Sequence, residues 1–187
     1  MASTVYLKDN SNCFEYFICN FPDDDKKSVC ISNAIVISKA FKNSDSIENV
    51  FLEKCELIQE SSFENCKDLR NIIWREKNRK EESTSLQIKN LHGINLLSIN
   101  KITIQHESFK NCTKMQTLIL PVSKEISIEK DAFKGCSTLR TVVACSDTIH
   151  FTENPFEDCP EELVFICYKG SAIEQFAREN GYRWINV

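Results

Sequence analysis

The amino-acid sequence predicts a right-handed α/β-type solenoid of about six coils, with a parallel sheet along one side. The first observation is a recurring phenylalanine, with spacings of 22, 46, 24 and 23 residues. The second is that the residues around each phenylalanine agree in type from copy to copy. A unit this short cannot bury its own apolar face, so stacked copies must share one core. The phenylalanines are Phe41, Phe63, Phe109, Phe133 and Phe156.

The positions that follow each phenylalanine predict the course of one coil. Apolar residues follow six, nine and eleven positions later, and in four copies a cysteine follows three positions later. Spacing by three is that of a helical turn, whereas the alternating pair at nine and eleven predicts a strand with two inward side chains. An upstream pair such as Ile102 and Ile104 is compatible with a second short strand. The cysteine column comprises Cys66, Cys112, Cys136 and Cys159.

Two units depart from this pattern. The interval of 46 residues is interpreted as two periods, with a degenerate unit in which Ile88 takes the phenylalanine position. In the last unit, the apolar residue expected six positions after the phenylalanine comes one residue later, at Leu163. Counting the strand from Leu163 assigns its inward positions to Ile166 and Tyr168. Six units then occupy residues 31–169 of a single domain that spans residues 1–187.

Both ends of a solenoid need a cap, because an open coil exposes its apolar face and its strand edges. Residues 1–30 are predicted to form an N-terminal hairpin cap, since the β-prone stretch 13–21 is broken by a charged run and resumes at residue 28. Residues 170–187 are predicted to form a helix and a strand. Ser171 with Glu174 forms a capping box, and Gly181 suits the helix end. A complete cap is expected at a natural chain end.

At this point the sequence resembles a known family. The stretches Ile102–Pro121 and Ile126–Val143 look like the BspA-like class of leucine-rich repeats, and the tail Tyr168–Gly181 is similar to the family's C-terminal ending. The resemblance implies a curved leucine-rich-repeat solenoid, of a kind often found on the surfaces of bacteria and protists. It implies no catalytic residues, because the family has none in its repeat motif.

The composition argues against several functions. The 187 residues carry a net charge of −4, and 23 basic and 27 acidic residues are mixed along the chain, unlike a nucleic-acid-binding protein. No apolar run approaches the ~20 residues that cross a bilayer. Lys8, Asp9 and Glu15 interrupt any secretion leader, which predicts a cytoplasmic location, with a cell surface reached by a non-standard route as the alternative. Four glycines leave no phosphate-binding loop, and no cofactor is predicted.

Neither the ten cysteines nor the three histidines form a recognised motif. No C-x-x-C pair is present. The cysteine column could hold a metal or disulfides, but burial of free thiols as small apolar side chains is favoured, as expected in a reducing compartment. His92, His106 and His150 share no short motif with cysteines or carboxylates, so no metal site and no catalytic residue is predicted. The charged stretch 75–85 is interpreted as a solvated loop.

The strand alternation predicts a binding surface on the concave face of the sheet. Residues eight and ten positions after each phenylalanine should point outward, and the row at ten is mainly apolar. Exposed apolar stripes often mark interfaces, although β-branched and aromatic residues also simply favour strands. The predicted middle row comprises Phe51, Ile73, Ser98, Ile119, Val143 and Cys167. The predicted flanking row comprises Asn49, Asn71, Thr117, Thr141 and Phe165.

The predicted function is a non-enzymatic protein-interaction module that uses this concave face. The partner is another protein or a second copy of the chain. A cell-surface adhesin or host-contact protein is the alternative. A homodimeric structural protein and an enzyme with a site assembled across coils are less favoured, because nucleophilic catalysis needs a base near the nucleophile and no sequence signature marks one.

Overall fold

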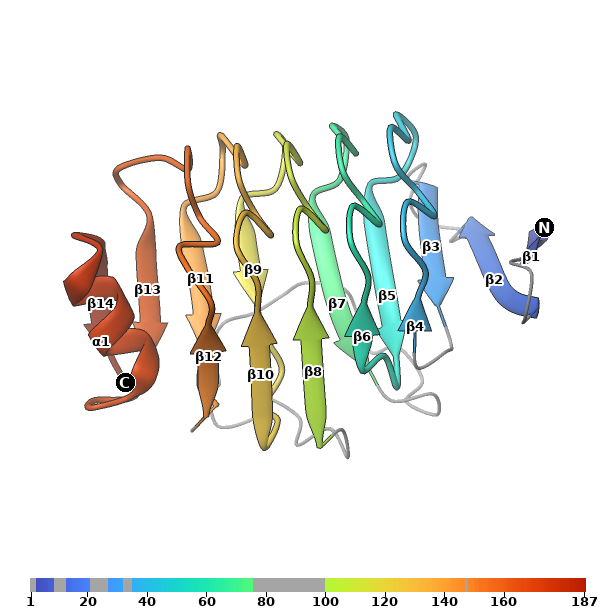
Figure 1. Cartoon of the computed structure of the whole chain (residues 1–187). Coiled ribbons are helices and arrows are strands. Elements are labelled where there is room, and N and C mark those ends of the chain that lie inside the picture. Colours follow the sequence, from blue (N-terminus) through green and yellow to red (C-terminus); the bar gives the residue numbers. More distant parts are fainter. Residues whose placement is uncertain (1–2, 9–12, 21–26, 32–34, 76–99, 147) are drawn as a thin grey trace.

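The chain winds into a parallel solenoid, whose coils follow one another across Figure 1. The computed structural model describes residues 3–8, 13–20, 27–31, 35–75, 100–146 and 148–187. Each coil contains two short strands that lie on opposite sides of the solenoid and are joined by a tight turn. We call these sides the first side and the second side, and the chain passes from a second-side strand through the turn to a first-side strand. First-side strands are β3 (Lys27–Ile31), β5 (Asn49–Glu53), β7 (Asn71–Arg75), β9 (Thr117–Ile119), β11 (Thr141–Ala144), β13 (Val164–Cys167) and β14 (Arg183–Asn186). Second-side strands are β4 (Ile35–Val36), β6 (Leu57–Ile58), β8 (Lys101–Ile104), β10 (Glu125–Ile128) and β12 (Ile149–Phe151).

Equivalent residues of successive coils form columns, because each coil adds one strand in parallel register. On the second side, Ile126 of β10 is paired with Ile102 of β8 and with Ile149 of β12. These pairings confirm that the upstream Ile-x-Ile pairs form a second short strand. On the first side the strands form two ladders, β3-β5-β7 and β9-β11-β13-β14, and β7 lies beside β9 without a hydrogen-bonded ladder. The predicted parallel solenoid is therefore confirmed.

The first-side strands deliver their alternate side chains to the core as predicted. Residues nine and eleven positions after the first four phenylalanines are at most 9% exposed. They join the buried isoleucines of the second side in one apolar cluster between the two sides of the solenoid. The inward first-side residues of these coils are Val50, Leu52, Ile72, Trp74, Leu118, Leu120, Val142 and Ala144.

The phenylalanines stack into a continuous spine beneath the turns. Ring centroids of successive phenylalanines from Phe41 to Phe156 lie 5.1, 5.1, 5.2 and 5.4 Å apart, with nearly parallel planes. The rings of Phe63, Phe109 and Phe133 are fully buried. The predicted repeat therefore places its most regular residue at the centre of the packing.

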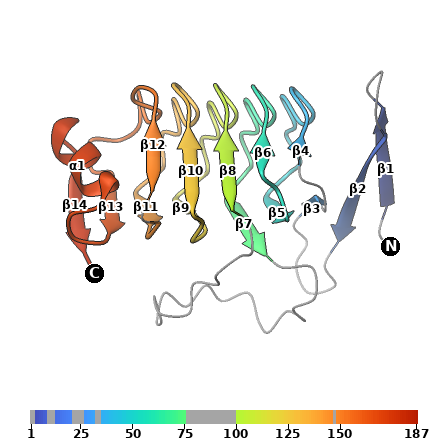
Figure 2. The same cartoon turned by 60° about the horizontal axis from the view of Figure 1, so that its bottom comes forward.

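The turns that carry these phenylalanines stack along one edge of the solenoid (Figures 1 and 2). Their internal backbone hydrogen bonds run from residue i+3 to residue i, as from the Ser44 amide to the Phe41 carbonyl at 3.1 Å. Asn65 and Asn111, each two residues after a phenylalanine, adopt a left-handed backbone with φ of 59°. Asparagine tolerates this conformation better than most residues. The side chains also form a ladder, since Asn111 Nδ2 donates to Asn65 Oδ1 at 2.9 Å.

The long interval between Phe63 and Phe109 does not separate them in the spine. Phe63 stacks directly on Phe109, although 46 residues separate them in the sequence. On the second side β6 pairs directly with β8, with Ile58 opposite Ile104. The spine therefore runs directly from Phe63 to Phe109. Residues 76–99, which include Ile88 and most of the charged stretch, lie outside the described residues.

The structure corrects the register of the last coil. Val142 is opposite Phe165 and Ala144 is opposite Cys167, and both β13 residues are fully buried. Tyr168, which was predicted to point inward, is 45% exposed. Leu163 is buried as predicted, but the extra residue before it is absorbed in the turn. The strand thus keeps the spacing set by its phenylalanine.

Both predicted caps are present. At the N-terminus β1 (Ser3–Lys8) and β2 (Cys13–Asn20) form an antiparallel hairpin, and β2 pairs antiparallel with β3, which joins the first side. At the C-terminus α1 (Ala172–Glu179) covers the last coil with Ile173, Phe176 and Ala177. Figure 2 shows the hairpin and the helix at opposite ends of the stack. No helix among the described residues is long and apolar enough to cross a membrane.

The C-terminal helix begins at its N-cap Ser171, whose side chain forms its half of the predicted capping box, whereas the Glu174 carboxylate binds the amide one residue earlier. The Glu174 amide donates to Ser171 Oγ at 3.3 Å, and the Glu174 carboxylate accepts from the Gly170 amide at 2.7 Å. The bond from the Gly170 amide lowers the pKa of Glu174, as does a bond from Asn186 of the edge strand. One ionised carboxylate therefore joins the helix start to the last strand of the sheet.

Candidate functional site

The predicted middle row is a real column on the outward face of the first side. Phe51 of β5 is opposite Ile73 of β7, and Ile119 of β9 is opposite Val143 of β11. Ile73 and Ile119 are half-buried, whereas Phe51 and Val143 are only 5% and 2% exposed. The expectation that the whole row meets water is therefore wrong for Phe51 and Val143.

Three residues of the predicted surface do not contribute to it as expected. Phe165 and Cys167 point into the core, because the last strand keeps the register of the preceding strands. Ser98 lies outside the described residues. The outward residue of β13 is instead Ile166, which is opposite Val143 and half-buried.

Sequence reasoning also missed both ends of this column. Cys30 of β3 is opposite Phe51, and Ile185 of β14 is opposite Ile166 and 55% exposed. Counting nine and eleven positions from Phe156, rather than from Leu163, would have assigned Ile166 correctly. We call the outward residues Cys30, Phe51, Ile73, Ile119, Val143, Ile166 and Ile185 the apolar column.

The predicted flanking row is polar, and part of it is already hydrogen-bonded. Asn71 Nδ2 donates to Asn49 Oδ1 at 2.7 Å, and Asn49 Nδ2 donates to Ser28 Oγ at 3.3 Å. Asn49 is 8% exposed. Thr117 and Thr141 are half-buried and opposite each other on β9 and β11. The column therefore has a polar border, in which the two asparagines bind each other, Asn71 is exposed and the threonines are half-buried.

The cysteine column has a structural role in the turns. Each thiol donates to the carbonyl oxygen of the phenylalanine in the preceding coil, with Sγ–O distances of 3.0 to 3.3 Å. Burial raises the pKa of Cys66 to about 11 and that of Cys159 to about 12, and it raises the pKa of Cys112 and Cys136 as well. A protonated thiol is a poor nucleophile and a poor metal ligand. These contacts favour packing over chemistry for the column.

The eight cysteines whose side chains are described are free thiols. We expect a thiol-specific reagent at pH 8 to react slowly with the four column thiols of the folded protein, because burial keeps them protonated. After denaturation without reductant, at least eight thiols should react at once. The measurement is a thiol titration before and after adding guanidinium. Fewer than eight reactive thiols in the denatured protein would demonstrate disulfides.

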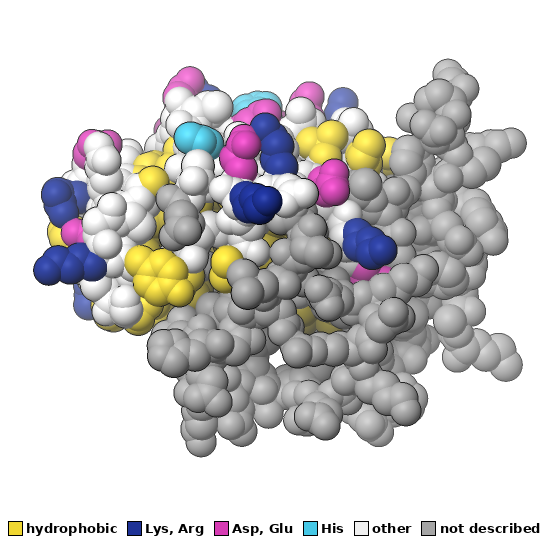
Figure 3. All heavy atoms as spheres, turned by 90° about the horizontal axis from the view of Figure 1, so that it is seen from below, with side chains coloured by type: hydrophobic (Ala, Val, Ile, Leu, Met, Phe, Trp, Pro, Cys, Tyr) yellow, Lys and Arg dark blue, Asp and Glu magenta, His cyan; other side chains and the backbone are white. Residues whose placement is uncertain are grey.

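Charged side chains of both signs are interleaved over the described surface. Ion pairs connect neighbouring coils, such as Lys42 with Glu64 at 2.7 Å and Lys101 with Glu125 at 2.7 Å. Figure 3 shows basic, acidic and imidazole side chains side by side on one face. The charges thus form local pairs between coils, and the described part of this face has no uniformly basic area of the kind that attracts nucleic acid.

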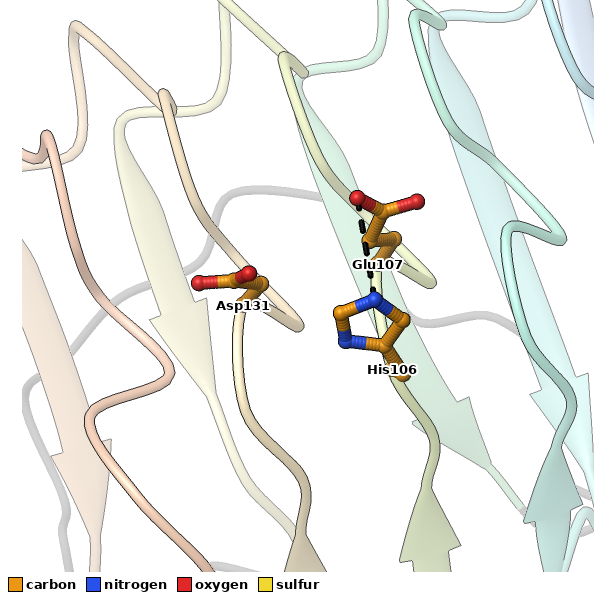
Figure 4. A group of neighbouring side chains, drawn as sticks. All are labelled: His106, Glu107 and Asp131. Atoms are coloured by element: carbon orange, nitrogen blue, oxygen red, sulfur yellow. Dashed lines mark ion pairs between the residues drawn. The ribbon is translucent and has the colours of Figure 1, made fainter.

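One group of potential metal ligands is present among the described residues. His106 and Glu107 follow β8, and Asp131 follows β10 in the next coil (Figure 4). One ligand atom from each residue lies within 4.8 Å of the others. His150, in contrast, is exposed on β12.

Comparison with known proteins agrees with this architecture. The BspA type leucine rich repeat region matches residues 34–162 in six copies. A leucine rich cell surface protein from Faecalibacterium prausnitzii A2-165 superposes with a TM-score of 0.57 at 20% identity, over 93% of this chain and 40% of that one. The pneumococcal vaccine antigen PcpA superposes with a TM-score of 0.53 at 14% identity, over 86% of this chain and 41% of that one.

The chain thus spans about two fifths of the length of each of these solved structures. No curated protein matches the sequence. At these identities the solved structures establish the fold alone, whereas the six matched repeats cover more than half of the chain. The stacked phenylalanines, the paired short strands and the repeat match lead to one conclusion: the chain belongs to the BspA-type leucine-rich repeat family.

Proposed function

We propose that the chain is a non-enzymatic protein-interaction module that binds its partner through the apolar column. The observation that carries the proposal is the repetition of this column within both first-side ladders, β3-β5-β7 and β9-β11-β13-β14. Every described first-side strand from β3 to β14 contributes an apolar or thiol side chain at the same outward position. Repeat proteins use such extended surfaces for binding, and an apolar core with a polar border is the usual anatomy of an interface.

The differing exposure along the column indicates where contact is made. Phe51 and Val143 have little surface left to bury. Ile73, Ile119 and Ile166 are half-buried, and Ile185 is 55% exposed. A partner gains most by covering these four isoleucines, because the gain scales with the apolar area removed from water. Asn71 and the half-buried threonines of the flanking row can add hydrogen bonds at the border.

The test replaces exposed column residues with charges. In the variant Ile119→Asp with Ile166→Asp, we expect partner binding to weaken at least about tenfold, because a carboxylate buried without a counter-charge is costly. Val143 is left unchanged, since it is buried and a charge there would disturb folding. The partner is first isolated by pull-down with the wild-type chain, and its affinity for both chains is then measured by calorimetry.

The matched control lies on the opposite side of the solenoid. Thr103→Asp with Ser127→Asp adds the same two charges at half-buried, outward positions of β8 and β10. This control should bind like wild type, and circular dichroism should show that both variants are folded. Equal binding by the column variant and wild type would refute the proposed surface. Light scattering adds the self-association test: a dimer that is lost only in the column variant identifies a second copy as the partner.

A second candidate function is that of a cell-surface adhesin or host-contact protein. The two solved structures described above favour it, because one is a cell surface protein and the other a vaccine antigen. The sequence-based prediction of a cytoplasmic location has no support from these neighbours. Labelling of intact cells with an antibody against this chain distinguishes the two locations, and permeabilised cells provide the control.

A further inference from the structure

The turn edge contains one irregularity in an otherwise regular array. The position two residues before each phenylalanine carries Lys39, Ser61, Glu107, Asp131 and Asn154 in successive coils. Only one pair of adjacent coils thus brings two carboxylates together at this position, and a histidine precedes the first of them. Figure 4 shows His106 and Glu107 on one turn and Asp131 on the neighbouring turn.

The imidazole of His106 is held in the orientation of a metal ligand. Its Nδ1 atom lies 2.9 Å from the carbonyl oxygen of Lys130. Because a carbonyl can only accept, Nδ1 is the protonated nitrogen of the neutral ring, and the lone pair of that ring is then on Nε2. The His106 amide also donates to Glu129 Oε2 at 3.0 Å. Metal-binding histidines are typically oriented in this way, by a backbone carbonyl on the other ring nitrogen.

Glu107 and Asp131 each place a carboxylate oxygen within 4.8 Å of a ring nitrogen of His106. Glu107 Oε1 lies 3.7 Å from His106 Nε2. Asp131 is only 8% exposed, and its Oδ1 atom is buried without a hydrogen-bond partner, 3.9 Å from Lys134 Nζ. A buried carboxylate oxygen without a donor is costly, and a bound cation would satisfy it.

We propose that His106, Glu107 and Asp131 form a binding site for a divalent transition metal of the zinc type. One imidazole nitrogen with two carboxylate oxygens suits zinc better than magnesium or calcium, which prefer oxygen alone. The ligand atoms lie within 4.8 Å of one another, and metal binding requires side-chain rotation to bring them to the spacing of about 3.3 Å in a tetrahedral zinc site. The fourth position stays open to water.

Lys110 competes for the same site. Its Nζ donates to Glu107 Oε1, which is one of the three ligand atoms. Metal binding therefore requires Lys110 to swing away, which its partly exposed side chain allows. Replacing Lys110 should therefore raise the affinity of the site for the metal. A variant that merely fails to fold would not show such an increase.

The experiment titrates chelator-treated, full-length protein with Co²⁺ and follows its visible absorption, with Zn²⁺ added afterwards as a competitor. We expect one bound Co²⁺ that Zn²⁺ displaces. His106→Gln and Asp131→Asn should each weaken binding at least about tenfold. Asparagine suits the left-handed backbone of position 131, where φ is 59°, so that variant keeps the turn. Lys110→Met should bind more tightly than wild type.

His150→Gln is the matched control, because His150 is an exposed histidine away from the group, and it should bind like wild type. Chemical denaturation of each variant checks that the fold is retained. A strong sulfur-to-cobalt charge-transfer band would assign the metal to cysteines and overturn the proposal. So would unchanged affinity in His106→Gln, or no binding by wild type and Lys110→Met at millimolar Co²⁺.

Discussion

Replacing Phe109 with alanine is expected to lower the free energy of unfolding by about 3–5 kcal/mol. The ring is fully buried and stacks on Phe63 at 5.1 Å and on Phe133 at 5.2 Å. Its removal leaves a cavity in the middle of the spine and takes stacking partners from both neighbours. Because each coil contacts only its neighbours, the cavity also interrupts the continuity between the two halves of the array. Guanidinium denaturation followed by circular dichroism measures the loss.

Phe133→Ala should behave like Phe109→Ala, since Phe133 is equally buried between two rings. Phe41→Ala is the control at the end of the spine, where the ring is half-buried and the loss should be smaller. A loss below about 1 kcal/mol for Phe109→Ala would show that the spine does not stabilise the fold.

Replacing Gly135 with alanine is expected to cost about 2–3 kcal/mol, from two separate causes. Gly135 has φ of +70°, a left-handed backbone that side chains rarely adopt. An added Cβ would also lie 2.3 Å from Asn111 Oδ1. Asn111 would have to rotate away and lose its hydrogen bond to Asn65. The measurement is the free energy of unfolding from chemical denaturation.

Gly181→Ala separates the two causes. Gly181 has a similar φ of +74°, but nothing lies within 4 Å of the position of an added Cβ. Its substitution therefore reports backbone strain alone, about 1–2 kcal/mol. We expect Gly135→Ala to be the more damaging by about 1 kcal/mol, the contribution of the asparagine ladder. Equal effects of the two substitutions would show that the ladder adds no stability.

The binding surface was only partly predictable from the strand pattern. Alternation alone correctly assigned Ile73 and Ile119 to the outward face, because successive strand side chains point to opposite faces. It failed at Phe165, where counting from the shifted anchor Leu163 turned the whole strand over. It also gave no information on exposure, since Val143 is outward and yet 2% exposed.

The sequence by itself determined the repeat, the inward residues of the regular coils, both caps and the column of cysteines. These features are local or periodic, and each coil depends only on its neighbours, so a single register predicts them all. The tertiary structure alone decided that Phe63 packs on Phe109 across 46 residues, and that His106 and Asp131, 25 residues apart, place ligand atoms within 4.8 Å of each other. Such contacts depend on which coils are adjacent. Where the period of the repeat is interrupted, the spacing of residues along the chain does not reveal which coils are neighbours.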